Sequence, residues 1–307
     1  MTEFCVETYI NNLEENTSTI FVNQQIYYLP DLSKFTNLQI LNCANNQLTF
    51  LPTLNKNLKI LYCNNNLLTF LPPLNDNLVK LCCDNNLLTF LPNLNEKLQT
   101  LYCHNNQLTF LPHLNVNLQL LCCHSNQLLT LPSLNDKLQT LNCHNNQLVT
   151  LPPLNVSLQD LYCYNNQLTF LPSLNINLYF LFCSNNQLTK LPSLNVSLEI
   201  LYCSNNQLTL LPTLNKNLRL LTYDYNPIYE IIDSHNLFII NKKIQILHKF
   251  CYLYYYLKFK TQFRDFLWKK IREPKIIQKY HPSYLNEILK NDLEDTLDLD
   301  MVLNSWI

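Results

Sequence analysis

Three histidines recur at intervals of twenty residues, and imidazole is the side chain that most readily binds a metal ion or changes its charge near neutral pH. They are His104, His124 and His144, and Asp84 stands one interval earlier. If residues twenty apart occupy adjacent strands, their backbones lie roughly 4.8 Å apart. Two imidazoles could then share a metal ion, and Cys122 could add a further ligand.

The histidine column also has two interpretations that need no metal ion. Duplication of one repeat produces it without any ligand, and a pH-sensitive contact surface would use the same imidazoles. Side chains in one column of a sheet point in similar directions, and the sequence reveals no partner that would orient the rings around an ion. We therefore assign His104, His124 and His144 to contact with a partner, and we assign no metal and no cofactor.

The other reactive residue types show no catalytic arrangement. No nucleophile stands at a defined spacing from a base, no carboxylates are paired, and the His-Glu-x-x-His motif is absent. The chain contains no glycine, which excludes the glycine-rich phosphate cradles of P-loop and Rossmann proteins. We predict that the protein is not an enzyme.

The element that must position these residues is a twenty-residue unit, of which residues 51–70, LPTLNKNLKILYCNNNLLTF, are one copy. A leucine–proline pair opens nine successive copies, and a column of nine cysteines runs in register from Cys43 to Cys203. A period this regular predicts a solenoid, in which each unit stacks only on its neighbours.

Within one unit, apolar and polar residues alternate with the period of a short strand. Leu61 and Cys63 are expected to point into the core, whereas residues 60, 62 and 64 point to an open, concave face. Asn66 then turns the chain, and its amide is expected to satisfy backbone groups of adjacent coils. Pro72 holds the return segment extended on the convex side. One strand per unit predicts a parallel β-sheet.

The pattern L-x-x-L-x-C-x-x-N-x-L and the Leu-Pro-x-Leu start resemble the leucine-rich repeat, and within it the short LPX subclass known from secreted effectors of Gram-negative pathogens. Two features depart from that subclass. Asn55, Asn75 and their successors stand where a second proline is usual, and cysteine takes the third core position of the strand. Some of those effectors end in a ubiquitin-ligase domain, but this C-terminal region is far shorter and Cys251 has no acidic neighbour. The resemblance therefore does not imply ligase activity.

We predict a leucine-rich-repeat solenoid with a parallel β-sheet on the concave face, an extended, polyproline-II-like convex side, and a small C-terminal α-helical domain. The predicted boundaries are an N-terminal cap at residues 1–28, about ten repeats at 29–228, and a C-terminal helical cap or domain at 229–307. The composition and the C-terminal sequence, from KIIQKYHPSYLNEIL to the final Asn-Ser-Trp, resemble those of repeat proteins from giant amoeba-infecting viruses.

The thirteen cysteines do not indicate a disulfide framework, because nine of them fill one inward column, where cysteine acts as a small apolar residue. The acidic N-terminal segment lacks the apolar region of a secretory signal, and no transmembrane segment is predicted. We expect a soluble, intracellular protein with reduced thiols, in the host cytoplasm if it is virus-encoded.

The concave face is the predicted binding surface, because aromatic side chains on a rigid sheet give a large contact area at low entropic cost. The predicted anchors are Tyr62, Tyr102, Tyr162, Phe180, Phe182 and Tyr202, beside the histidine column. The alternative is that aromatic residues simply favour strands. We predict a protein–protein interaction module that binds an unidentified host or viral protein.

Residues 241–280 form a second candidate surface, with eleven lysines and arginines against two acidic residues. Apolar residues in this segment are spaced as in a long amphipathic helix, which Pro274 ends or kinks. Such a helix could bind nucleic acid or an anionic membrane surface. We favour a role as a cap on the last repeat, with two further short helices near 285–289 and 299–306. A structural role in a particle is a third hypothesis.

Overall fold

The computed structural model describes residues 5–279 and divides the chain into two compact units, one ending at Ile244 and one beginning at Gln245. Each unit is described by itself. The short helices predicted near residues 285–289 and 299–306 lie outside the described residues.

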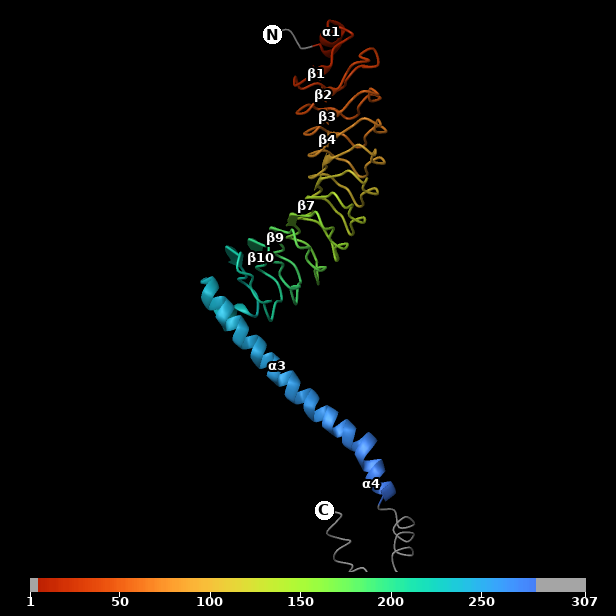
Figure 1. Ribbon diagram of the computed structural model, residues 1–307. Coiled ribbons are helices and arrows are strands. Elements are labelled where there is room, and N and C mark those ends of the chain that lie inside the picture. The colour runs from red at the N-terminus through yellow and green to blue at the C-terminus, as the bar shows by residue number, and fades with distance from the viewer. Residues whose placement is uncertain (1–4, 280–307) are drawn as a thin grey trace, which may run out of the picture. The chain divides into compact units, whose positions relative to one another are not determined.

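The first unit contains one parallel sheet of eleven strands that follow one another in sequence order (Figure 1). The register joins residues twenty apart, so that Ile60 pairs with Lys80 and Tyr62 with Cys82. The prediction of a parallel repeat solenoid is confirmed, with one strand more than the ten predicted. The strands are β1 (Thr19–Phe21), β2 (Ile40–Asn42), β3 (Ile60–Tyr62), β4 (Lys80–Cys82), β5 (Thr100–Tyr102), β6 (Leu120–Cys122), β7 (Thr140–Asn142), β8 (Asp160–Tyr162), β9 (Phe180–Phe182), β10 (Ile200–Tyr202) and β11 (Leu220–Thr222).

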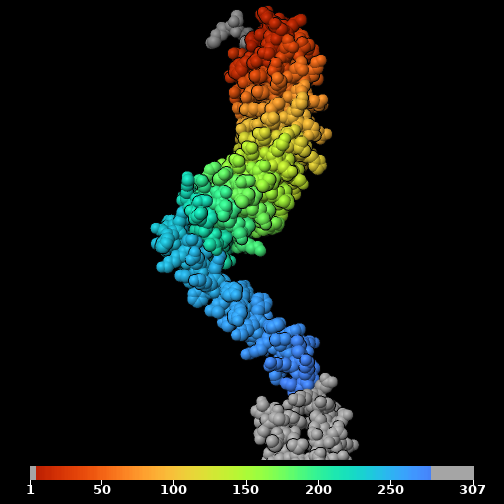
Figure 2. All heavy atoms as spheres, in the orientation of Figure 1, coloured from red at the N-terminus to blue at the C-terminus, as the bar shows by residue number. Residues whose placement is uncertain are grey.

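The core is a stack of leucine and cysteine columns. In the coil that contains β3, Leu58, Leu61, Cys63 and Leu68 are completely buried, and their counterparts in most other coils are buried to the same degree. In the space-filling view of Figure 2, successive coils of this unit lie directly on one another. The return segments between β2 and β11 form turns and extended chain without helix, which confirms the predicted extended convex side. The array bends between β7 and β10, and the strands lie on the inner side of the bend (Figure 1).

An asparagine ladder supplies the hydrogen bonds that the buried corner of each coil needs. Asn66 Nδ2 donates to the carbonyl oxygens of Cys43, at 2.9 Å, and Cys63, at 3.1 Å, and Asn66 Oδ1 accepts the amide of Leu48 at 3.0 Å. One amide thereby joins two coils, because it is a donor and an acceptor at once. The expectation for Asn66 is confirmed, and the same bonds recur up to Asn226.

The residue before each ladder asparagine has a left-handed backbone, with φ of 54° at Asn65. Glycine would ordinarily take this position, and asparagine is the residue that tolerates it best in a chain without glycine. Most of these side chains form a second ladder, in which Asn65 Nδ2 donates to Asn45 Oδ1 at 2.8 Å. Ser125 replaces asparagine in this series and interrupts it, and the last member is Tyr225.

A third asparagine series explains the departure from the usual second proline. Asn115 Nδ2 donates to the carbonyl oxygens of Asn95, at 2.6 Å, and Leu98, at 3.0 Å. Asn55 and Asn175 make equivalent bonds to the preceding coil. Proline has no hydrogen-bond donor, so it could not join the return segments in this way.

The N-terminal residues extend the sheet. Helix α1 (Val6–Asn11) buries Val6 and Ile10, and strand β1 pairs in parallel with β2. The predicted N-terminal cap therefore includes the first strand of the sheet as well as a capping helix. These apolar side chains cover the first cysteine-containing coil, which would otherwise be exposed to water.

The C-terminal side of the first unit ends in helix α2 (Tyr229–Ile232) and the start of helix α3 (Leu237–Leu267). Tyr223, Ile228, Ile232, Ile240 and Ile244 are all buried. The hydroxyl group of Tyr223 also donates a hydrogen bond to the carbonyl of Ser234 at 2.6 Å. These contacts close the last coil, which supports the predicted capping role for the beginning of the helix.

The second unit contains the rest of α3, a π-helical segment η1 (Trp268–Arg272) and helix α4 (Glu273–Lys279). Pro274 lies in the first turn of α4, where its missing amide hydrogen is tolerated. The helix therefore changes from α-helical to π-helical hydrogen bonding just before Pro274, and it continues beyond this proline. From Gln245 to Ile277 nearly every side chain is exposed, so the predicted apolar face of 241–280 is buried only at Ile244 among the described residues.

Candidate functional site

The concave face is formed by the first and third residues of each strand and by the second residue after the strand. The third-residue column contains Tyr62, Tyr102, Tyr162, Phe182 and Tyr202, and Phe180 lies in the first-residue column. All six predicted anchors are half-buried and face the same side of the sheet as the predicted histidines. These residues therefore lie on the face that the repeat pattern predicts, while their part in binding stays a prediction.

Three of the anchors form a continuous aromatic cluster on β8, β9 and β10. The rings of Tyr162 and Phe182 are stacked with centroids 4.8 Å apart, and Tyr202 meets Phe182 edge to face at 4.6 Å. A hollow of about 340 Å³ lies over them. Tyr164 and Ser184 also line it, and the sequence analysis did not name them as candidates. Burial and the nearby Asp160 carboxylate raise the pKa of Tyr162, so its hydroxyl keeps its proton.

The anchors Tyr62 and Tyr102 are separated by Cys82, which is buried. The ammonium group of Lys80 lies close to both rings. Lys80 Nζ is 5.0 Å from the ring centroid of Tyr62 and 5.8 Å from that of Tyr102. The lysine therefore links the two rings through cation–π contacts, and these anchors are not free aromatic surface.

The histidine column is a stack of flat rings. Ring centroids are 4.3 Å apart between His104 and His124 and 4.1 Å apart between His124 and His144, and the stack continues to Tyr164 at 4.1 Å. Burial, together with repulsion from neighbouring histidines, lowers the pKa of His124 and of His144 to about 4. These imidazoles are neutral near pH 7, so the geometry does not favour the pH-sensitive contact surface considered from the sequence.

Three side chains of this region could hold a metal ion. A nitrogen of His104, a nitrogen of His124 and the sulfur of Cys122 lie within 4.8 Å of one another. His104 is also paired with Asp84, whose Oδ2 lies 3.5 Å from His104 Nε2. The carboxylate is a ring-orienting partner that the sequence analysis did not recognise, because Asp84 stands in the same column one strand earlier.

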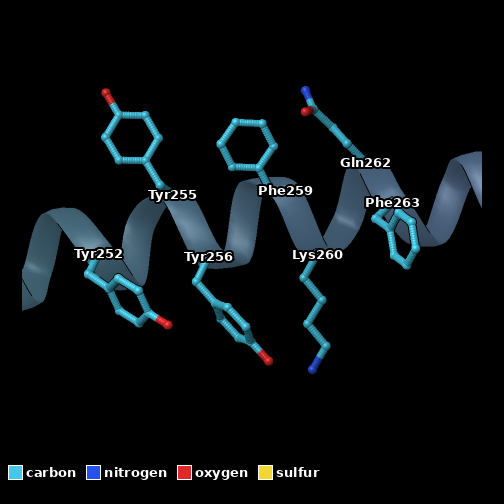
Figure 3. Close-up of a pocket in the computed structure, with 7 residues that line it drawn as sticks. All are labelled: Tyr252, Tyr255, Tyr256, Phe259, Lys260, Gln262 and Phe263. Atoms are coloured by element: carbon cyan, nitrogen blue, oxygen red, sulfur yellow. The ribbon is translucent and has the colours of Figure 1, made fainter.

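The second unit carries a different kind of surface. Figure 3 shows Tyr252, Tyr256 and Lys260 on one side of helix α3, and Tyr255, Phe259 and Gln262 on the other. A hollow of about 840 Å³ runs along these side chains. All of its described lining residues come from one helix and project into solvent, so it is an uneven surface rather than an enclosed ligand site.

Basic and aromatic side chains lie close together along part of this helix. Lys258 Nζ lies 5.9 Å from the ring centroid of Tyr254, and Lys260 Nζ lies 5.7 Å from that of Tyr256.

None of the helices between residues 5 and 279 combines the length and the apolar character that crossing a bilayer requires.

Neither the known family models nor the curated proteins include a match to this sequence. Solved structures do match. YopM, described as a leucine-rich effector protein from Yersinia pestis, is 35% identical, with 70% of this chain and 68% of that chain covered and a TM-score of 0.62. YopM from Yersinia enterocolitica WA-314 is 31% identical over 70% of this chain, with a TM-score of 0.56, and this chain spans 57% of its length.

The functional domain of InlJ from Listeria monocytogenes, whose structure includes a cysteine ladder, is 29% identical. The match covers 68% of this chain and 54% of that chain, with a TM-score of 0.52. The cysteine column and the parallel strands at a period of twenty residues agree with these comparisons. This chain therefore belongs to the leucine-rich-repeat proteins with a repeat of about twenty residues.

Proposed function

We propose that the protein is an interaction module that binds a protein partner through its concave face. The observation that carries this proposal is the aromatic cluster of Tyr162, Phe182 and Tyr202 with its hollow. The rings are already held by their neighbours, so binding costs them little conformational entropy. The leucine-rich-repeat structures that the chain resembles include an effector protein and a repeat domain within an octameric complex.

The cluster offers both an apolar surface and polar groups. A partner side chain that enters the hollow contacts ring faces of Tyr162 and Phe182, and the protonated hydroxyl of Tyr162 can donate a hydrogen bond to a partner carbonyl. Removing one well-packed aromatic anchor costs about 2 kcal/mol or more in typical interfaces, which is roughly a 30-fold loss of affinity.

The test is affinity capture from host-cell cytosol, read by quantitative mass spectrometry. The wild-type chain is compared with a Tyr162→Ala, Phe182→Ala, Tyr202→Ala variant. The matched control is Val116→Ala, Val156→Ala, Ile176→Ala, which removes three exposed apolar side chains from the return segments. A protein retained by the wild type and the control but lost by the concave variant supports the proposal. Equal capture by all three chains contradicts it, provided that their circular dichroism spectra agree.

The class of partner depends on the source of the chain. We propose that the chain is encoded by a giant amoeba-infecting virus and that it acts on a host or viral protein inside the cell. The support is the resemblance of the composition and of the C-terminal sequence to such repeat proteins. Detection of the transcript only in infected amoebae would support this source, whereas a copy in the genome of an uninfected cellular organism would contradict it.

A second candidate function rests on the second unit. From Gln245 to Ile277 eight lysines and arginines stand against two acidic residues, and aromatic rings lie between them. We propose nucleic-acid binding or anionic-membrane binding as the alternative role. Binding of a fluorescent single-stranded RNA or of anionic vesicles should weaken steeply as salt rises, because counterions are released. Affinity that does not change with salt would rule this alternative out.

A further inference from the structure

We propose that His104, Cys122 and His124 form a binding site for a zinc-type divalent metal ion on the concave face. This inference does not depend on the concave face binding a protein. Its first basis is distance, because one donor atom from each residue lies within 4.8 Å of the other two. Nitrogen and sulfur ligands of a tetrahedral zinc ion are about 3.4–3.6 Å apart, so the donor atoms must approach by roughly 1 Å and their lone pairs must turn toward the ion.

The second basis is the environment of His104. Asp84 is almost fully buried and its Oδ2 lies 3.5 Å from His104 Nε2, which favours the tautomer with the ring proton on Nε2. The other nitrogen, Nδ1, is buried and has no hydrogen-bond partner among the described residues. Leaving a buried lone pair unmatched is unfavourable, and a metal ion satisfies it. A carboxylate behind a histidine ligand is the usual arrangement at zinc sites.

The third basis is that the repeat changes its residues at this place. Cys122 stands between Tyr102 and Asn142 in its column, and although Cys82 occupies the same column two strands earlier, among the described residues Cys122 is the cysteine grouped with two histidines. Ser125 replaces the asparagine of the second ladder, and its hydroxyl lies 3.1 Å from His124 Nδ1. That contact occupies Nδ1 of His124 and leaves Nε2 as the nitrogen that can bind an ion once the ring turns. His144 also has its Nδ1 bonded within its own coil, to Asn142 Oδ1, but it belongs to no group of potential metal ligands among the described residues.

Coordination requires a change of ring orientation. The rings of His104 and His124 are stacked with 25° between their planes, whereas ligand lone pairs lie in the ring plane. The half-buried ring of His124 must therefore rotate about its side-chain bonds, while the strands stay in place. The thiol proton of Cys122 is released to solvent on binding, and the fourth position is left to water or to a partner side chain.

The donor set selects the class of metal. Two imidazoles and one thiolate suit Zn²⁺ and Co²⁺, whereas Mg²⁺ and Ca²⁺ need oxygen ligands. The test uses the full-length chain with Cys5→Ser and Cys251→Ser, which removes the two exposed thiols, after treatment with reductant and chelator. Co²⁺ is titrated as the probe, and sulfur-to-cobalt charge transfer is read in the near ultraviolet.

One equivalent of Co²⁺ should give a charge-transfer band that Zn²⁺ displaces and Mg²⁺ does not. Cys122→Ser should abolish the band, and His104→Asn and His124→Asn should weaken binding at least about 10-fold. Asp84→Asn, which changes only the positioning of His104, should weaken it about 10-fold. Cys82→Ser and His144→Asn are the matched controls from the same columns and should leave binding unchanged. Absence of the band, or its survival in Cys122→Ser, overturns the proposal, with unchanged thermal unfolding as the check on folding.

Discussion

At the scale of single residues, the array depends on side chains that donate and accept hydrogen bonds at the same time. Asn66 satisfies two carbonyl groups and one amide in the interior of a coil, where water is excluded. Aspartate has nearly the same shape but offers only acceptors. Its oxygen would face the carbonyl oxygens of Cys43 and Cys63 without a donor between them. The ladder position therefore tests how much one side-chain donor contributes to stability.

Asn66→Asp should lower the free energy of unfolding by about 2–4 kcal/mol, because it buries a charge and leaves two carbonyl groups unpaired. Gln107→Glu is the control, since it introduces the same change at an exposed position. Urea unfolding followed by circular dichroism gives both values. A loss for Asn66→Asp that is no larger than that of the control would show that the ladder bonds contribute little.

The cysteine column gives a second residue-scale prediction. Burial raises the pKa of Cys43 to about 12, and it raises the pKa of Cys63 well above the ordinary value, so these thiols hold their protons. Only a thiolate reacts rapidly with a disulfide reagent. In the native protein Cys5 and Cys251 should react with Ellman's reagent, and the eleven buried thiols should react only in denaturant. Rapid release of more than two equivalents from native protein would contradict this.

At the scale of elements, the ends of the array need covering because each strand has only three residues and depends on its neighbours. The first turns of helix α3 carry Ile240 and Ile244, which are completely buried and close the last coil together with Ile232. The same helix is exposed from Gln245 onward. Its first two turns therefore serve stability, and its later turns are available for other contacts.

Ile244→Ala should lower the free energy of unfolding by about 2–4 kcal/mol, since it removes buried methyl and methylene groups and leaves a cavity. Ile246→Ala, two residues further along the same helix, is the control at an exposed position and should change stability by less than about 0.5 kcal/mol. Hydrogen exchange should be faster in strands β10 and β11 of the first variant. Equal stability of the two variants would argue against the capping role.

The sequence predicts the strands and their inward faces because the period of twenty leaves one register for Leu61 and Cys63. Ile20, Phe21 and Ile26, which lead into Leu29-Pro30, resemble a decayed first unit, but without the cysteine of the column they predict only a cap and not that β1 joins the same sheet. At the candidate site, the positions of the aromatic and histidine columns follow from the repeat. The low pKa of His124 and the pairing of Asp84 with His104 do not, since the first depends mainly on how deeply the ring is buried and the second on the side-chain conformations of adjacent strands.

At the scale of the whole molecule, the first unit is a one-dimensional array in which each coil contacts only the coil before it and the coil after it. Such an array can lose a complete coil and still pair its remaining strands, because every coil presents the same two faces. The concave face is different, because its clusters are local. The aromatic cluster is confined to β8, β9 and β10, whereas the Lys80 bridge is confined to β3, β4 and β5.

This separation of fold from surface leads to a deletion experiment. Removing residues 171–190 joins Phe170 to Leu191, keeps the repeat in register and deletes strand β9 with Phe180 and Phe182. Removing residues 71–90 is the matched deletion, which keeps the aromatic cluster and deletes strand β4. Both chains should remain folded, with a urea m-value about one tenth smaller, because one coil fewer is exposed on unfolding. Only the first should lose the captured partner. If both deletions lose it, the partner needs the full length of the concave face, and if neither does, binding lies outside the aromatic cluster.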